Sequence, residues 1–239
     1  MSVGGFGLNG IVTNGLVLNL DAANRRSFVS GSTSWYDLSG RNNRGTLNGP
    51  TGGVPSYSSA NGGSIQFDGT DDYCVTNSSN IWDLSDNLTI ECWIYMTSNT
   101  GYRGIFGTFN GNNGYAPYNG YSFVSPGGDT KWCFLVAFTD NTIKYIYSDN
   151  NYTLNKWTHL VGTVGGGYSR FYVDGVLQID NSTKNVKSPG NVPLIMGRYY
   201  YNIDSLYFAG RISTCKIYNR ALSATEILQN YNTLKNRYQ

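Results

Sequence analysis

The segment KWTHLVGTVGGGYSRFYVDGVLQ, residues 156–178, decides the fold class of this chain. It contains three apolar runs, separated by short turns of glycine and aspartate. Asp174 and Gly175 stand between FYV and VLQI, and this pair is the strongest hairpin signal in the sequence, because a type I′ turn needs positive φ at both central residues. The segment therefore predicts antiparallel strands that are joined by tight turns.

A second informative segment is LTIECWIYM, residues 88–96. Leu88, Ile90, Cys92 and Ile94 alternate along it and share one face of a strand, while Trp93 and Tyr95 point to the other face. A strand that is apolar on both faces belongs in the middle of a sandwich.

About a dozen short strand candidates fill the chain from Gly15 onward, without a break in composition. With 30 glycines and 15% aromatic residues, the chain has the turns and the packing residues of an all-β domain. We read SIQFDG and DYCVTN (64–77) as a strand pair with Asp68-Gly69 as its turn. The long Ser-, Gly-, Asn- and Pro-rich stretch 24–63 is a loop of the kind that usually carries a contact or wraps a face.

Only the C-terminal segment ALSATEILQNYNTL has a helical pattern. Ser223 followed by Glu226 forms a capping box, and Ile227, Tyr231 and Leu234 recur at helical spacing. We expect this short helix to cover one edge or end of a sheet. The sequence thus predicts one domain, a two-sheet antiparallel jelly-roll sandwich, over residues 15–239.

Charge and terminal patterns exclude several function classes. The net charge is +2 and the basic residues are dispersed, so we expect no nucleic-acid partner. The sequence contains no stretch of 18 apolar residues, so we expect no membrane span. The N-terminus MSVGGFGLNGIVTNG has no basic region, apolar core or cleavage site of a signal peptide, so we expect synthesis in a host cytoplasm.

The four cysteines do not suggest a metal site. Each lies in a strand-like run with no CxxC spacing, so free buried thiols are expected; the residues are Cys74, Cys92, Cys133 and Cys215. Disulfides stay possible only if the fold brings two of their Cα atoms close together.

Four stretches in order resemble the laminin-G-like, concanavalin A-like jelly roll. They are DLSGRNNRGTLNG (37–49), SIQFDGTDDYCVT followed by LTIECWIYM, KWTHLVGTVGGGYSRFYVDGVLQ, and FAGRISTCKIYNRALSATEILQNY (208–231). One departure is that Ile212 is followed by Ser213, where the family often has an acidic residue. The resemblance implies a binding or scaffolding module of the type found in adhesion proteins, sugar-binding proteins and tailed-bacteriophage structural proteins.

Catalysis has weak support in the residues. Glycoside hydrolysis needs a pair of carboxylates, and enzymes of this fold alternate Glu and Asp along one strand. Here the whole chain has two glutamates, Glu91 alone on its strand and Glu226 in a helix cap. His159 is the only histidine, and a lone strand histidine is more often a packing residue than a base. We therefore expect no enzyme, no catalytic residues and no cofactor.

Calcium is the one cofactor that the residues leave open. Asp68, Asp71 and Asp72 cluster in FDGTDDY beside a tight turn, and Ca²⁺ takes several carboxylate and carbonyl oxygens. The alternative is that Asp68 caps the turn while the other two are solvated, and the sequence favours this alternative.

Tyrosine-rich loops are the most plausible partner-binding surface, because tyrosine offers rigid contact area and a hydroxyl group. The candidates are Tyr102, Tyr115, Tyr118, Tyr121, Tyr199, Tyr200 and Tyr201. The alternative is that they are ordinary strand tyrosines with one exposed face.

Residues 1–14 form a glycine-rich segment that we expect to be an extended arm. Its apolar residues are Val3, Phe6, Leu8, Ile11 and Val12. Their near-alternate spacing suits a strand added to a neighbour, so we expect the arm to bind a second subunit or a shell and to be dispensable for the fold. The sequence thus favours a virion protein, either capsid decoration or tail fibre, with protein neighbours or further copies of itself as partners. The alternatives are a lectin-like, receptor-binding glycan module and, more remotely, a glycoside hydrolase.

Overall fold

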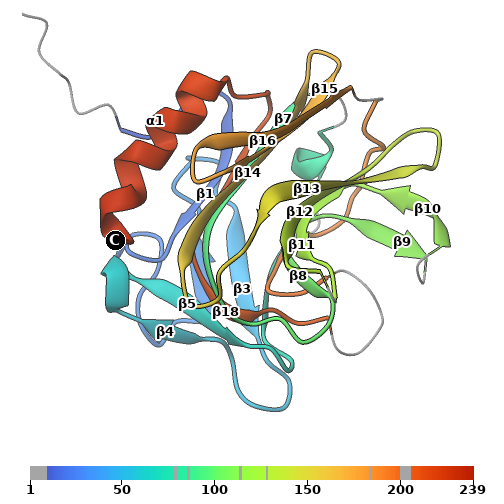
Figure 1. The fold of residues 1–239 in the computed structure, drawn as a ribbon. Coiled ribbons are helices and arrows are strands. Elements are labelled where there is room, and N and C mark those ends of the chain that lie inside the picture. Colours follow the sequence, from blue (N-terminus) through green and yellow to red (C-terminus); the bar gives the residue numbers. More distant parts are fainter. Residues whose placement is uncertain are drawn as a thin grey trace, which may run out of the picture.

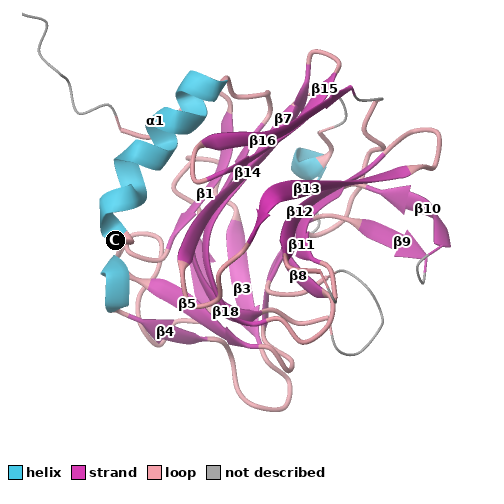
Figure 2. Cartoon of the chain, viewed as in Figure 1, coloured by secondary structure: helices cyan, strands magenta, loops and turns pink. Residues whose placement is uncertain are grey.

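The computed structural model of the chain describes residues 10–77, 80–84, 87–112, 115–127, 129–182, 185–199 and 206–239. Within these residues two antiparallel sheets pack face to face, with one α-helix outside them (Figures 1 and 2). The predicted all-β sandwich is confirmed. No helix in the described part of the chain is long and apolar enough to cross a lipid bilayer.

The first sheet has the order β16-β15-β14-β7-β18-β5-β4, and β1 also pairs with β18. Its strands are β1 (Leu16–Asp21), β4 (Ser56–Ser58), β5 (Ser64–Asp68), β7 (Leu88–Ser98), β14 (Trp157–Gly165), β15 (Tyr168–Val173), β16 (Val176–Ser182) and β18 (Ala209–Tyr218). As predicted, β7 lies in the middle, and its alternation places Leu88, Ile90 and Cys92 in the core between the sheets. Trp93 packs in a separate cluster on the outer face.

The second sheet has the order β13-β12-β11-β8-β17-β6-β3-β2. Its strands are β2 (Ser34–Tyr36), β3 (Arg44–Asn48), β6 (Tyr73–Thr76), β8 (Arg103–Gly107), β11 (Tyr121–Ser125), β12 (Lys131–Ala137), β13 (Ile143–Asn151) and β17 (Ile195–Met196). A separate pair, β9 (Asn110–Asn112) and β10 (Tyr115–Asn119), projects beside it (Figure 1). Three 3₁₀ turns, η1 (Ala60–Gly62), η2 (Asn80–Trp82) and η3 (Lys235–Arg237), complete the regular structure.

Two local signals in the sequence are confirmed by the backbone. The hairpin between β15 and β16 turns at Asp174 (φ 51°) and Gly175 (φ 78°), which is the positive-φ pair that a type I′ turn needs. Ser223 is the N-cap of helix α1 (Ala224–Leu234). Its side chain accepts a hydrogen bond from the N–H of Glu226, and the Glu226 carboxylate accepts one from the N–H of Ser223.

Two predictions about arrangement were wrong. Strands β5 and β6 do not pair with each other but belong to opposite sheets, because Phe67 and Cys74 enter the core from opposite sides. Helix α1 covers the outer face of the first sheet rather than an edge or end (Figure 1). The cause is that this face carries apolar side chains, among them Val161 and Tyr218, which need a cover.

All four cysteines are free and buried, as the sequence predicts. Burial raises the pKa of their thiols, so they remain protonated and act as small apolar side chains; these groups are Cys74, Cys92, Cys133 and Cys215.

Candidate functional site

The two residues with the strongest catalytic potential lie in a closed polar network beneath α1. Glu91 and His159 face each other across β7 and β14, and both are fully buried. Lys216 Nζ lies 2.7 Å from Glu91 Oε1, and Asn230 Nδ2 of α1 donates to Oε2 at 2.6 Å. His159 Nε2 is 3.2 Å from Oε1 but is not aligned for a hydrogen bond.

This network is structural. Burial raises the pKa of Glu91, but the Lys216 ammonium and His159 more than offset that effect and hold it at about 2. The His159 ring stacks on Trp93 with centroids 5.0 Å apart, and Trp93 also stacks on Tyr231 of α1. The helix thus covers the network, and the side chains of Glu91 and His159 have no exposed surface.

The other glutamate is also engaged. Glu226 completes the helix cap and accepts two hydrogen bonds from Arg220, at 2.9 and 2.5 Å. The hydrogen bond from Arg220 lowers the pKa of Glu226 to about 2, so the group is a carboxylate at neutral pH. Neither glutamate is placed as a general acid.

The predicted tyrosine surface is mostly an internal cluster. Tyr199 packs against Phe109 (5.6 Å between ring centroids) and Tyr102 (5.3 Å), and Tyr118 stacks on Phe109. These rings cover the outer face of β11 and β12.

The other tyrosine predictions have different outcomes. Tyr121 is fully buried in the main core and donates to Trp82 O at 3.0 Å, so the expectation of a surface contact there is wrong. Tyr200 and Tyr201 lie outside the described residues, as does the side chain of Tyr115. Tyr36, Tyr145 and Tyr168, which sequence reasoning did not select, are more exposed.

The arm prediction is corrected for Ile11 and Val12, which belong to the described residues. Val12 is buried against its own domain: its N–H donates to Asn230 Oδ1 at 2.8 Å, and its carbonyl accepts from the Tyr218 hydroxyl at 3.0 Å. Ile11 packs beside it. These two residues belong to the sandwich because the outer face of the first sheet offers them apolar contacts and hydrogen-bonding groups. Val3, Phe6 and Leu8 lie outside the described residues.

The fold brings together the three aspartates of FDGTDDY. One carboxylate oxygen from each of Asp68, Asp71 and Asp72 lies within 4.8 Å of the other two. Asp71 and Asp72 are buried rather than solvated, at 7% and 6% exposure, which corrects the favoured alternative for these two. Asp68 does accept from the Thr70 N–H (2.7 Å), as a turn cap would.

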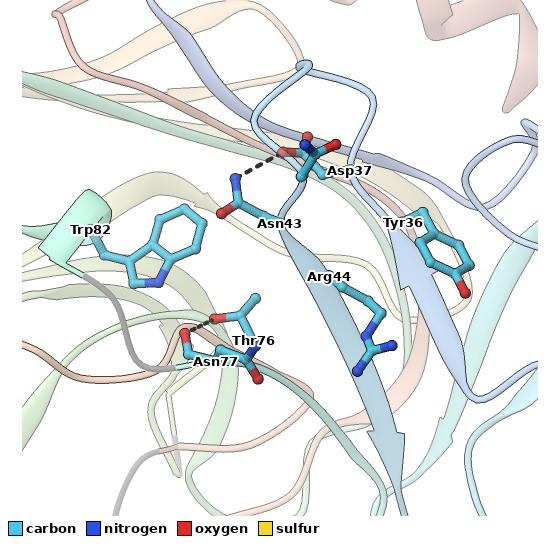
Figure 3. Close-up of a pocket in the computed structure, with 8 residues that line it drawn as sticks. Tyr36, Asp37, Asn43, Arg44, Thr76, Asn77 and Trp82 are labelled. Carbon is cyan, nitrogen blue, oxygen red and sulfur yellow. Dashed lines mark hydrogen bonds between the residues drawn. The ribbon is translucent and has the colours of Figure 1, made fainter.

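A groove of about 520 Å³ opens at the β2–β3–β6 end of the second sheet (Figure 3). Its lining combines aromatic, amide, hydroxyl and charged groups: Tyr36, Asp37, Asn42, Asn43, Arg44, Thr76, Asn77 and Trp82. Tyr36 and Arg44 are partners across β2 and β3, so both side chains leave the same face of the sheet. In Figure 3, Tyr36 and Trp82 stand on opposite sides of the groove.

The Asp37 carboxylate builds this groove. Its Oδ1 accepts the N–H groups of Asn19 (2.9 Å) and Ser39 (2.8 Å). Its Oδ2 accepts from the Ser39 hydroxyl (2.7 Å) and the Asn43 amide (2.8 Å). With four donors, Asp37 fixes the hairpin loop against β1 and is not available as a catalytic base. Residues 24–63, predicted as one long loop, in fact contain β2, β3 and β4. Five of the eight groove residues come from this stretch, although none of them was chosen from the sequence.

The fold of this chain has counterparts in known proteins. A family model of the Concanavalin A-like lectin/glucanases superfamily matches residues 68–228. The chain belongs to this superfamily. The match covers the β5–β6 turn, the strands from β6 to β18 and the first five of the eleven residues of α1. A comparison with curated protein sequences gives no match.

Solved structures with the superfamily fold resemble this chain over most of its length. Domain 4 of AbnA, a GH43 extracellular arabinanase from Geobacillus stearothermophilus solved in complex with arabinotriose, has a TM-score of 0.67 and 18% identity, over 94% of this chain and 98% of that domain. The botulinum neurotoxin serotype D binding domain has a TM-score of 0.68 and 17% identity over 92% of this chain. The binding domain of Paraclostridial Mosquitocidal Protein 1 has a TM-score of 0.67 and 19% identity over 92% of this chain. This chain spans 51% and 52% of those last two chains.

Proposed function

We propose that this chain is a non-catalytic glycan-binding module whose ligand lies in the groove over β2, β3 and β6. The composition of the groove carries the proposal. A sugar presents a CH face that packs on an aromatic ring, and hydroxyls that pair with amide and guanidinium groups. Tyr36 (49% exposed) offers the ring, and Arg44, Asn42 and Asn77 offer the polar groups.

The same groove argues against hydrolysis. Glycosidases need two carboxyl groups on either side of the bond that is cut. Among the residues that line the groove, Asp37 is the single acid, and its two oxygens already accept four hydrogen bonds. Buried Glu91 and capped Glu226 do not supply a second one.

The arabinanase domain supports the choice of a first ligand. It shares the fold over nearly its entire length, and it was solved with arabinotriose bound. Arabinotriose and a panel of other oligosaccharides should therefore be titrated by calorimetry, followed by a glycan array. We expect binding of at least one oligosaccharide and no release of reducing ends on prolonged incubation.

Alanine substitutions test whether the glycan binds in the groove over β2, β3 and β6. Tyr36→Ala and Arg44→Ala should each weaken binding by about tenfold or more, since each removes a central contact. Tyr168→Ala is the matched control, because Tyr168 is a similarly exposed tyrosine (44%) on a strand of the other sheet. If Tyr168→Ala loses binding while Tyr36→Ala keeps it, the groove is not the site. If no glycan binds at all, the proposed function is wrong.

A second candidate is the role in a virion that the sequence favours. Its support is strand β13, which lies at the edge of the second sheet and carries Tyr145 (39% exposed) stacked on Tyr147 at 6.2 Å. Edge strands and exposed aromatic rings are common protein-contact surfaces. The test is whether the protein sediments with assembled particles, and whether Tyr145→Ala abolishes that association. The two candidates are separable, because a purely structural protein shows no dependence on sugar.

A further inference from the structure

The network beneath α1 brings three reactive groups of the chain itself together. Lys216 and Glu91 are direct partners across the antiparallel strands β18 and β7. Asn230 reaches the same carboxylate from α1, which packs on this face of the sheet. An amine, a carboxylate and a carboxamide from three different elements are therefore in contact, and they are placed to act on each other rather than on a ligand from solution.

The Glu91 carboxylate bridges the other two groups with its two oxygens. Its Oε1 lies 2.7 Å from Lys216 Nζ, and its Oε2 accepts a hydrogen bond of 2.6 Å from Asn230 Nδ2. A group that moves protons between two reacting partners must lie within hydrogen-bond distance of both. Glu91 meets this condition for an amine that could attack and for an amide nitrogen that could leave.

The carbonyl of the Asn230 side chain is engaged as well. Its Oδ1 accepts the N–H of Val12 at 2.8 Å. A donor in this position stabilises the negative charge that develops on a carbonyl oxygen when a nucleophile attacks its carbon. On the other side of the amide, Nδ2 contacts the Tyr218 hydroxyl at 3.0 Å. Hydrogen bonds therefore hold both ends of the amide in place.

The three groups are shielded from water. Glu91 and Asn230 have no exposed surface, and Lys216 retains 1%. The apolar cluster that includes Tyr218 and Ile227 lies beside them under α1. The exclusion of water removes the competing reaction, which is hydrolysis of the Asn230 amide, and it protects a product bond in the same way.

We propose that Lys216 and Asn230 form an intramolecular isopeptide bond, with Glu91 as the proton relay between them. Glu91 first takes one proton from the Lys216 ammonium, which leaves a neutral amine beside a neutral acid. Nζ then attacks Cγ of Asn230, the bond from Cγ to Nδ2 breaks, and ammonia leaves. Of the two protons that Nζ gives up, one departs with the ammonia and the other stays on Glu91. The reaction needs no further reactant, and it replaces a buried ion pair with two neutral groups.

The ion pair is the dominant form before the reaction. Burial raises the pKa of Glu91, but the Lys216 ammonium and His159 outweigh this effect and hold that pKa at about 2. The neutral amine and acid therefore coexist in only a small fraction of molecules, and we expect the bond to form slowly after folding. Freshly folded protein is the ion-paired form, and aged protein is the cross-linked form.

The bond ties α1 covalently to the middle of the first sheet. Lys216 and Asn230 are close in the sequence, so the cross-link closes a short loop and restricts the unfolded chain, as a disulfide does. Cross-linked protein should therefore melt about 5 °C or more above unreacted protein. The glycan groove lies over the second sheet, so a failure of either proposal leaves the other unaffected.

Wild-type protein is tested first, before and after several days at physiological temperature. Its intact mass should fall by one molecule of ammonia. Trypsin does not cut after an acylated lysine, so a digest of the denatured protein should contain peptide 212–220, uncut at Lys216, joined to peptide 221–235. Succinimide formation at an asparagine also releases ammonia, but it leaves Lys216 open to trypsin. Complete cleavage after Lys216 in the aged protein overturns the proposal.

Two variants test the proton relay and the carbonyl contact. Glu91→Gln keeps the amine and the amide but cannot take up the proton, so it should give no joined peptides. Val12→Pro removes the N–H that donates to Asn230 and should slow the joining by at least about tenfold. It also serves if Glu91→Gln fails to fold. Joining at the wild-type rate in either variant contradicts the role of the residue that was changed.

Asn232→Ala is the matched control. Asn232 is an exposed asparagine in the same tryptic peptide as Asn230, so this variant should cross-link like wild type. Asn230→Ala has no side-chain carbonyl and should give no joined peptides, and its aged and fresh forms should melt at the same temperature. A joined peptide that fragmentation assigns to Asn232 overturns the pairing.

Discussion

Beneath α1 the buried carboxylate of Glu91 has its own cation, whereas at the β5–β6 turn buried Asp71 and Asp72 have none among the described residues. Lys216 lies 2.7 Å from Glu91, and a helix covers the pair. At the turn, three carboxylates meet and the partners are N–H groups and one hydroxyl.

The difference shows what determines the sign of a pKa shift in a protein interior. Burial pushes both groups toward the neutral acid. At Glu91 the ammonium overcomes that effect, and the pKa falls to about 2. At Asp72 like charges add to it, and the pKa rises to about 6. In the first region the buried charge is paired, while in the second like charges face one another.

Removal of the cation from the first region should have the largest effect. Lys216→Met leaves Glu91 buried without its counter-ion, which should cost about 3–5 kcal/mol in the free energy of unfolding. Urea denaturation followed by tryptophan fluorescence measures the loss. The double variant Glu91→Gln, Lys216→Met should recover most of it, because no buried charge remains. A loss below about 1 kcal/mol in the single variant would show that Glu91 reaches water or simply becomes protonated.

Deletion of residues 1–14 should have the next largest effect, because it removes Val12. The N–H of Val12 donates to Asn230, the residue that also donates to Glu91. The deletion leaves the Asn230 carbonyl and the Tyr218 hydroxyl without their Val12 partners and exposes Leu16 and Ile227. We expect a loss of about 2–4 kcal/mol in urea unfolding. Deletion of residues 1–9 alone keeps Val12, so the difference between the two truncations measures the contribution of residues 10–14. If both truncations unfold at the wild-type urea concentration, Val12 does not contribute to stability.

The dependence of stability on pH separates the two regions directly. The raised pKa of Asp72 stabilises the fold below about pH 4, and this contribution is lost as the pH rises through about 6. The lowered pKa of Glu91 stabilises the fold above about pH 4.5, and this is lost as the pH falls through about 2. In chelator, acidification from pH 7 to pH 5 should therefore raise the stability by about 1 kcal/mol, reduced by solvent screening.

Asp72→Asn should abolish that gain, while Lys216→Met should leave it intact. Thermal melts at a series of pH values test both variants. If the melting temperature of the wild-type protein decreases on acidification from pH 7 to pH 5 in chelator, Asp72 is not under charge repulsion.

The smallest effect on stability belongs to the glycan groove. Tyr36→Ala removes an exposed ring, so the unfolding free energy should change by less than about 0.5 kcal/mol while binding is lost. Paired measurements of binding and urea denaturation on one preparation provide the check. A large loss of stability would assign Tyr36 to packing rather than to ligand binding.

Local signals predicted the elements of this fold well. Alternation in Leu88–Met96 identified a central strand, Asp174-Gly175 identified a hairpin, and Ser223 with Glu226 identified the start of the helix. Each of these signals acts within a few residues, where backbone sterics and short-range hydrogen bonds decide the conformation.

The same reasoning failed where a residue's role depends on distant partners. Tyr121 and Tyr168 both lie on strands, yet the first is in the core and the second is exposed. Glu91 looked like an isolated acid because Lys216 is 125 residues away and Asn230 is 139 residues away. No pattern in the sequence pairs these residues before the strand order is known.

The sequence by itself determined that this chain forms short antiparallel strands around a core of apolar and thiol side chains, ended by one capped helix. Only the tertiary structure decided that β5 and β6 lie in opposite sheets, that α1 covers a face, and that Glu91 is neutralised while Asp71 and Asp72 are not. The physical reason is range. Periodicity, turns and caps follow from the conformational preferences of neighbouring residues, whereas charge pairing and burial depend on which strands the hydrophobic core brings together.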